Sequence, residues 1–133
     1  MKKGLLDFYA KSESSRSQRS DYVYRIRYVD EMLSEIPIKK KKVVDIGCGD
    51  CHYVASKLLA SADFILGLDI SLKALHVGKR KGIDVILADA EYLPLRNDSF
   101  DLVLCMEVIE HLLHPEKEIN ELCRIGRKWI VIS

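Results

Sequence analysis

Short apolar runs alternate along this chain with segments in which apolar residues recur three or four positions apart. The β-branched and aliphatic runs predict strands, and the segments between them predict helices. The expected strands cover residues 42–46, 64–69, 83–87, 100–106 and 128–132. The expected helices cover residues 21–36, 52–60, 71–81, 107–112 and 115–125. Ser20 or Asp21 caps the first helix, and Pro37 ends it.

Five strands that alternate with helices predict an α/β fold. The expected architecture is a doubly wound, Rossmann-like parallel sheet with right-handed crossovers and helices on both faces. Numbered along the chain, its strands should lie in the order 3-2-1-4-5, which puts the switch point between the first and fourth strands. Ligands of such sheets bind there, at the carboxyl ends of the strands. The unusual residues of this chain fall at those ends.

The segment 43–51 carries the clearest signal among them. Its β-branched run stops at Gly47 and Gly49, and a helical pattern follows. Glycine permits a tight turn and a close approach of a ligand, and a helix N-terminus favours anions, so the segment predicts a nucleotide cradle. Asp69 ends the next strand, 20 residues after Gly49, where its carboxylate can accept hydrogen bonds from ribose hydroxyls.

Composition narrows the function classes. The 133 residues suffice for one domain with a buried core. The chain has no apolar run near the roughly 20 residues needed to cross a bilayer, and its start lacks the apolar centre of a signal peptide. We therefore expect a cytoplasmic protein with no membrane partner.

Residues 1–42 carry eleven Lys/Arg and six Asp/Glu. The basic run at 39–42 is better explained as a solvated loop than as a phosphate-contacting patch, which disfavours nucleic acid as a partner.

Four cysteines, at positions 48, 51, 105 and 123, give no disulfide framework. Cys48 and Cys51 have the Cys-x-x-Cys spacing of redox and zinc sites. Such a site needs a second ligand pair or a thioredoxin-like context, and neither is present. The glycine turn explains this local sequence better, and we expect no metal site.

Four motifs in order resemble the class I S-adenosylmethionine-dependent methyltransferase family. Asp-Ile-Gly-Cys-Gly at 45–49 resembles its first motif, and Gly-Leu-Asp-Ile-Ser at 67–71 resembles its second-strand acidic motif. Residues 89–95 and 99–104 resemble the third- and fourth-strand signatures. Cys-Met-Glu-Val-Ile-Glu-His-Leu at 105–112 resembles the matching segment of quinone-pathway and related small-molecule O-methyltransferases. The resemblance covers residues 42–132.

The resemblance implies S-adenosyl-L-methionine as the cofactor and a role for each matching residue. The backbone at Gly47, Cys48 and Gly49 passes under the methionine end, and Asp45 orients the ammonium. Asp69 accepts both ribose hydroxyls, and Ile70 packs on the adenine. The adenine amino group donates to Asp89, and the backbone of Ala90 donates to the ring. Met106 lines the pocket near the sulfonium. Taken singly, Asp69 is equally explained as a helix cap and Asp89 as a turn residue.

The resemblance implies no universal catalytic residue, because the sulfonium of the cofactor already activates the methyl group. Glu107, Glu110 and His111 are candidate bases if the acceptor loses a proton. The same Glu-x-x-Glu-His arrangement resembles the magnesium-binding segment of small-RNA 3′-end methyltransferases. That family adds a His after the fifth strand, which this sequence does not show. Metal-assisted RNA ribose methylation is therefore kept as a further alternative.

Two departures from the family pattern matter. Cys51 stands where the family often has a third glycine. The sequence also ends just after the fifth strand, without the hairpin that completes the family's seven-stranded sheet. We therefore expect the strand at 128–132 to form an open apolar edge that pairs with a second copy or a partner chain.

Residues 1–41 are expected to form a helical lid over the core domain at 42–133. One arginine of this lid, Arg19 or Arg25, would meet the cofactor carboxylate, and Tyr9, Tyr22 and Tyr24 would supply apolar walls. The preferred function is methyl transfer to a small-molecule acceptor. The alternatives are a non-catalytic, partner-dependent cofactor-binding subunit and a nicotinamide-binding module, the latter disfavoured because the third glycine is missing.

Overall fold

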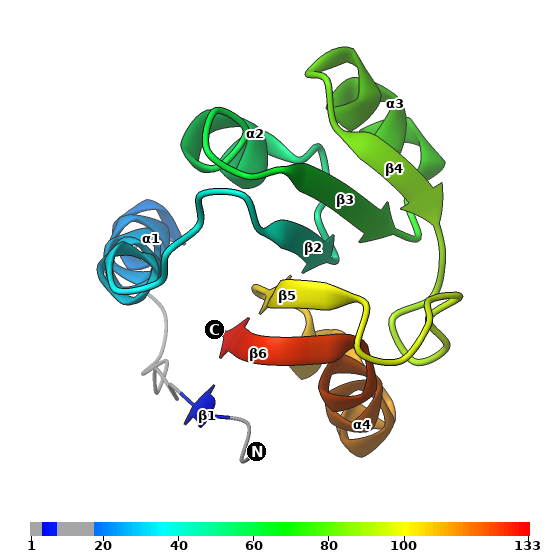
Figure 1. The fold of residues 1–133 in the computed structure, drawn as a ribbon. Coiled ribbons are helices and arrows are strands. Elements are labelled where there is room, and N and C mark those ends of the chain that lie inside the picture. Colours follow the sequence, from blue (N-terminus) through cyan, green and yellow to red (C-terminus); the bar gives the residue numbers. More distant parts are fainter. Residues whose placement is uncertain (1–3, 8–17) are drawn as a thin grey trace.

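The computed structural model describes residues 4–7 and 18–133 (Figure 1). Within them, six strands form one sheet in the order β1-β6-β5-β2-β3-β4, and every neighbouring pair is parallel. The strands are β1 Gly4–Asp7, β2 Lys42–Ile46, β3 Phe64–Asp69, β4 Asp84–Leu87, β5 Phe100–Cys105 and β6 Gly126–Ile132. The five expected strands therefore exist in the expected order, with the switch point between β2 and β5.

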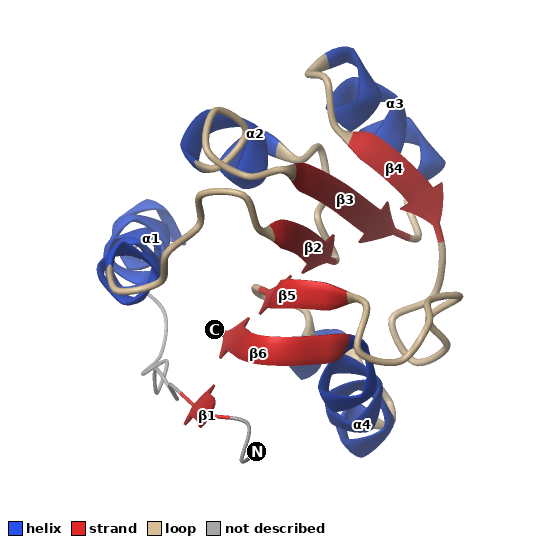
Figure 2. Ribbon diagram, in the orientation of Figure 1, coloured by secondary structure: helices blue, strands red, loops and turns tan. Residues whose placement is uncertain are grey.

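Helices cover both faces of the sheet and lie in every connection between consecutive strands except that from β4 to β5, which is the loop at 88–99 (Figure 2). They are α1 Gln18–Ser34, α2 His52–Lys57, α3 Leu72–Arg80, α4 Pro115–Ile125 and the short 3-10 helix η1 Ile109–His111. The predicted helix at 107–112 shrinks to η1, because Glu107 takes a left-handed backbone with a φ of 59°. Among the described residues, no helix has the length and apolarity needed to cross a membrane.

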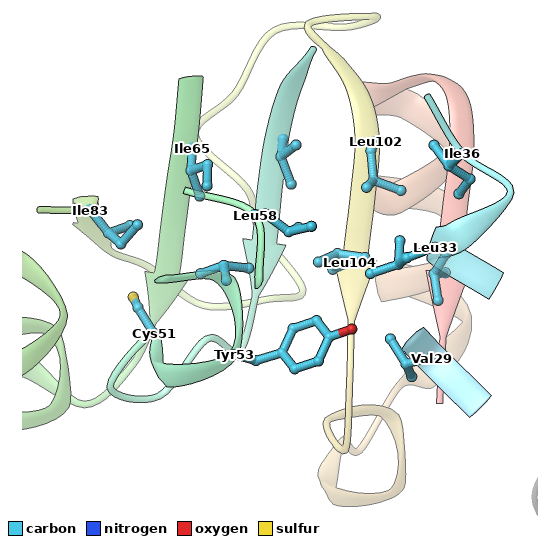
Figure 3. Packing of buried hydrophobic residues seen from close by; sticks show 13 residues of the cluster. Val29, Leu33, Ile36, Cys51, Tyr53, Leu58, Ile65, Ile83, Leu102 and Leu104 are labelled. Atoms are coloured by element: carbon cyan, nitrogen blue, oxygen red, sulfur yellow. The ribbon is translucent and has the colours of Figure 1, made fainter. Parts of the chain in front are cut away.

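Alternate residues of each central strand enter different halves of the core. Val43, Leu102 and Leu104 pack with Leu33 of α1 and Tyr53 of α2 (Figure 3). Val44, Val103 and Cys105 point to the other face and pack with Leu122 and Ile125 of α4. This alternation is the period of two that a strand imposes on its side chains. It explains why the central strands are apolar on both faces.

The outer edge of β6 is not open, which corrects the expectation for this strand. β1 pairs with it in parallel, with Leu5 opposite Ile130 and Leu6 opposite Val131. The backbone groups of β6 on that side therefore have partners within the same chain. The sequence alone does not predict β1, because two leucines in a basic segment are too short a run to predict a strand.

Helix α1 anchors the N-terminal part of the chain to the core. Val29, Leu33 and Ile36 are buried, as their helical spacing predicts, whereas Val23 is 63% exposed. The apolar stripe therefore begins one turn later than expected. Burial of this stripe brings the N-terminal half of α1 to the carboxyl ends of β2 and β5, where Arg25 and Ile26 line a cavity.

Candidate functional site

The loop after β2 can be built only with glycine at its first position. Gly47 has a φ of 69°, and a Cβ there would lie 2.1 Å from Cγ2 of Val108. Gly49 has a φ of 53°, and a Cβ there would meet no atom within 4 Å. The first glycine is therefore required by packing against the segment after β5. The second faces open space, where a ligand can approach the backbone.

Asp69, at the end of β3, ties this loop to the next helix. Its Oδ2 accepts a hydrogen bond from the N–H of Gly49 at 2.8 Å, and its Oδ1 accepts one from the N–H of Ser71 at 2.8 Å. The cap of α3 is Ser71, whose Oγ accepts from the N–H of Ala74. A carboxylate has about four acceptor positions, so roughly two remain for another donor.

A cavity of about 450 Å³ lies over the ends of β3 and β4. Asp69, Ile70, Asp89 and Ala90 line it from one side, and Val108 and His111 line it from the other. Ile70 is 77% exposed, which leaves an apolar surface beside the two carboxylates. Asp89 also accepts a hydrogen bond from the N–H of Glu91 at 2.9 Å. It therefore both stabilises the local turn and lines the cavity.

A second cavity of about 210 Å³ lies over the ends of β2 and β5. Its lining includes Arg25, Asp45, Gly47, Cys48, Met106 and Glu107. Gly47 and Glu107 line both cavities, so the two spaces adjoin at the glycine turn. The residues predicted to bind a cofactor are thus brought together in one bipartite site.

The smaller cavity holds a buried carboxyl and a guanidinium. Asp45 is 2% exposed, and burial raises its pKa well above the usual range, with the nearby Cys51 and Asp69 adding to the effect. The Nε of Arg25 lies 3.1 Å from Oε1 of Glu107, within ion-pair range. The N–H does not point at that oxygen, because Arg25 Nε is buried and has no hydrogen-bond partner among the described residues. The Asp45 carboxyl and the Arg25 guanidinium are therefore both suited to a charged ligand.

Glu107, which the sequence predicts only as a candidate base, lies where the two cavities meet. It lies outside η1, which begins two residues later and has Val108 as its N-cap. Its N–H donates to the carbonyl of Ser133 at 2.9 Å. Burial raises the pKa of Glu107, and the positive charge of Arg25 opposes that shift. No local pattern signals this position, since the left-handed backbone of a glutamate is not encoded by periodicity.

Glu110 and His111 are less well placed. The Glu110 side chain is 49% exposed and the His111 side chain 76% exposed, with 3.9 Å between Glu110 Oε1 and His111 Nε2. The described part of the chain contains no group of three or more His, Cys, Asp or Glu residues that could hold a metal ion. The metal-assisted alternative therefore has no geometric support from these residues.

Part of the predicted lid lies in this site. Arg25 lines the smaller cavity, as one of the two expected arginines. Tyr24 is 62% exposed and lines neither cavity, so its role as a wall stays a prediction. Tyr9, and the side chains of Arg19 and Tyr22, lie outside the described residues.

Comparisons with known proteins agree with this geometry. Residues 44–129 match the methyltransferase domain family. The ubiquinone biosynthesis O-methyltransferase of Thiobacillus denitrificans is 32% identical over 118 residues, which cover 82% of this chain and 49% of that protein. The chain thus spans about half the length of the curated relatives it matches.

Solved structures share the fold at lower identity. Phosphoethanolamine N-methyltransferase 1 of Haemonchus contortus, in complex with phosphoethanolamine and S-adenosylhomocysteine, aligns with a TM-score of 0.72 at 21% identity, over 86% of this chain and 26% of that one. The [4+2]-cyclase SpnF aligns with a TM-score of 0.68 at 21% identity, over 76% of this chain and 41% of that one. A fold of this kind therefore occurs in proteins of more than one activity. From the family match over residues 44–129, the ordered motifs and the parallel sheet together, this chain belongs to the class I S-adenosylmethionine-dependent methyltransferase family.

Proposed function

We propose that this chain binds S-adenosylmethionine across the two adjoining cavities and transfers its methyl group to a small-molecule acceptor. The observation that carries the proposal is the division of the site at Gly47. The larger cavity offers carboxylates and an apolar surface to an adenosine, and the smaller offers opposite charges to an amino acid. A cofactor made of these two halves can lie across the glycine turn.

The residues present fit such a cofactor. Open space over Gly49 leaves room for it beside the loop. Asp69 retains acceptor positions for two ribose hydroxyls, and Asp89 lines the same cavity with an acceptor for an adenine amino group. The buried Nε of Arg25, which has no hydrogen-bond partner among the described residues, suits a carboxylate, and the buried carboxyl of Asp45 suits an ammonium.

When bound, the cofactor supplies a methyl group that is already activated by the sulfonium charge. The chain's own contribution is then to position the reactants and exclude water. Met106 gives the smaller cavity an apolar wall beside Gly47. Glu107, at the junction of the cavities, has a raised pKa and is our candidate to accept a proton from an acceptor hydroxyl. The names of the ubiquinone biosynthesis O-methyltransferases favour a hydroxyl acceptor.

The domain division is part of the proposal. Within the expected lid of residues 1–41, β1 at Gly4–Asp7 belongs to the core sheet, so the lid would be α1, whose Arg25 shifts from Glu107 to the cofactor carboxylate when the site fills. The free thiols of Cys48, Cys51 and Cys105 suit the reducing cytoplasm, which we propose as the location. A non-catalytic, partner-dependent cofactor-binding subunit is the second candidate, since the chain spans about half the length of the curated relatives it matches.

The test is calorimetric titration of the full chain with S-adenosylhomocysteine, the demethylated product. We expect saturable binding, and a loss of affinity of about tenfold to a hundredfold in Asp69→Ala, because hydrogen bonds to a charged acceptor contribute roughly 1.5–3 kcal/mol. Asp63→Ala is the matched control, since Asp63 is exposed and precedes the same strand at its opposite end.

Two results would contradict the proposal. One is saturable binding of NAD with no response to S-adenosylhomocysteine. The other is unchanged affinity in an Asp69→Ala variant whose circular dichroism shows it to be folded. Binding without methyl transfer to any phenolic or catechol acceptor would favour the non-catalytic subunit instead.

A further inference from the structure

The glycine turn contains two thiols in contact. The Sγ atoms of Cys48 and Cys51 lie 3.3 Å apart, and the N–H of Cys51 donates to the carbonyl of Cys48 at 2.9 Å. This turn brings residues three apart to within about 7 Å between their Cα atoms, near the range that a disulfide spans. Both cysteines are free thiols.

Two glycines from other elements make room for this pair. A Cβ at Gly67, in the middle of β3, would lie 2.8 Å from the Sγ atoms of both cysteines. A Cβ at Gly78, on α3, would lie 2.6 Å from the Sγ of Cys51. Any larger residue at either position would collide with sulfur. The thiol pair is therefore accommodated by three separate parts of the fold.

The two thiols differ in access. Cys48 lines the smaller cavity, whereas Cys51 is 0% exposed. The hydrogen bond between the sulfurs lowers the pKa of Cys51 and raises that of Cys48. The pair therefore has one accessible thiol and one buried partner at contact distance, an arrangement that permits oxidation to a disulfide.

We propose that Cys48 and Cys51 form a reversible disulfide that weakens cofactor binding, the cofactor part resting on the function proposed above. The oxidant is a peroxide. One sulfur attacks a peroxide oxygen, an S–O bond forms as the O–O bond breaks, and the leaving hydroxide takes a proton to become water. The second sulfur attacks that sulfenic acid, the S–S bond forms as the S–O bond breaks, and a second water leaves. Two thiols lose two electrons and peroxide gains them, and a dithiol reductant reverses the reaction.

The geometry predicts which side of the pair moves. The sulfurs must approach from 3.3 Å to about 2.05 Å. Cys51 Sγ lies against both Gly67 and Gly78, whereas Cys48 Sγ lies against Gly67 alone. The residue before Cys51 is tied to the C-cap of α3, because Lys81 Nζ donates to the carbonyl of Asp50 at 2.9 Å and to its Oδ2 at 2.7 Å. The N–H of Cys48 donates to the carbonyl of Leu68 at 2.9 Å, and the peptide group on its other side leads to Gly49, which permits rotation.

Rotation at Cys48 displaces the next peptide group. That group carries the N–H of Gly49, which donates to Asp69 Oδ2 at 2.8 Å. The disulfide therefore breaks the hydrogen bond that holds the loop to the proposed ribose-binding carboxylate. Because binding and oxidation act on the same loop, bound cofactor should in turn slow oxidation of Cys48.

The first measurement is independent of the cofactor. The full chain is treated with hydrogen peroxide, and its peptides are analysed by mass spectrometry and by amide hydrogen exchange. We expect a Cys48–Cys51 link that dithiothreitol removes, and exchange of the Gly49 amide about tenfold faster or more in the linked form. Cys123→Ala, which changes a half-buried cysteine on the opposite face, should behave like the unmodified sequence. Cys51→Ala should form no such link.

The second measurement is the affinity for S-adenosylhomocysteine before and after oxidation, where we expect a loss of about tenfold or more that Cys51→Ala does not show. Absence of the link, or a link with unchanged Gly49 exchange, would overturn the proposal. A link that changes Gly49 exchange and leaves the affinity for S-adenosylhomocysteine intact would overturn the proposal that the disulfide weakens cofactor binding. If the reduced chain binds no S-adenosylhomocysteine, the proposed function fails, while the link and the exchange rates still decide the disulfide.

Discussion

Replacing Gly78 with alanine tests how tightly the thiol pair is packed. Gly78 is buried within α3, where alanine is normally preferred to glycine by about 1 kcal/mol. Helix propensity alone thus predicts a more stable protein. The new Cβ, however, would lie 2.6 Å from the Sγ of Cys51, about 1 Å short of the roughly 3.5–4.0 Å of ordinary non-bonded contact.

The packing penalty should exceed the gain in propensity. Cys51 Sγ cannot retreat freely, because Cys51 is fully buried and Cys48 Sγ lies 3.3 Å away. Overpacking of a buried site costs about 1–3 kcal/mol, and a contact this short belongs in the upper half of that range. We expect Gly78→Ala to lower the free energy of unfolding by about 1–2 kcal/mol, measured by urea denaturation.

A double-mutant cycle isolates the cause. In a Cys51→Ala background the sulfur is gone, and the nearest remaining atoms are Cys51 Cβ at 3.2 Å and the carbonyl oxygen of Asp50 at 3.4 Å. Gly78→Ala should then be close to neutral, which gives a coupling energy of about 1–2 kcal/mol between the two positions. Such coupling shows that the sulfur, and not the helix backbone, sets the cost.

Gly82→Ala is the control for this cycle. Gly82 ends α3 with a φ of 87°, and a Cβ there would meet only Leu59 Cδ2 at 3.9 Å. Its cost comes from the left-handed backbone, roughly 1 kcal/mol, and should be equal in both backgrounds. The packing argument would be refuted if Gly78→Ala stabilised the chain, or if its effect were the same with and without the Cys51 sulfur.

Three further predictions concern buried carboxyls and the sheet edge. Because burial raises the pKa of Asp45, its contribution to stability is present below the ordinary carboxyl pKa and is lost as pH rises through the raised value. Asp45→Asn should remove that loss and raise the melting temperature near neutral pH, which thermal unfolding scans from about pH 4 to 8 measure. The same variant should bind S-adenosylhomocysteine more weakly, which calorimetric titration measures. Glu118 is fully buried and accepts a hydrogen bond from the thiol of Cys105 at 3.1 Å. In urea denaturation, Glu118→Gln should change the free energy of unfolding by less than about 1 kcal/mol, and Glu118→Ala should lower it by about 2–4 kcal/mol. Deleting residues 1–7 should leave the outer edge of β6 unpaired and cause self-association seen by light scattering as concentration rises, and a variant that scatters like the full chain would show that β1 does not protect this edge.

The sequence by itself determined the framework of the fold. Apolar runs of five or six residues, buried on both faces, specify central parallel strands, and the alternation with helices specifies their order. The same reasoning places Gly47, Gly49, Asp69 and Asp89 at one edge, because the carboxyl ends of parallel strands meet there. These features are local or follow from general rules of connection, so a single sequence is enough to predict them.

Only the tertiary structure decided the contacts between distant residues. β1 owes its place to pairing with β6, more than a hundred residues away in the sequence. The ion pair between Arg25 and Glu107 joins α1 to the segment after β5, and no periodic pattern records it. The Cys48–Cys51 spacing was visible from the start, but its meaning depends on Gly67 and Gly78, which lie on other elements. Such features arise when folding brings separate segments into contact, and the energy of that contact resides in the packed pair rather than in either segment.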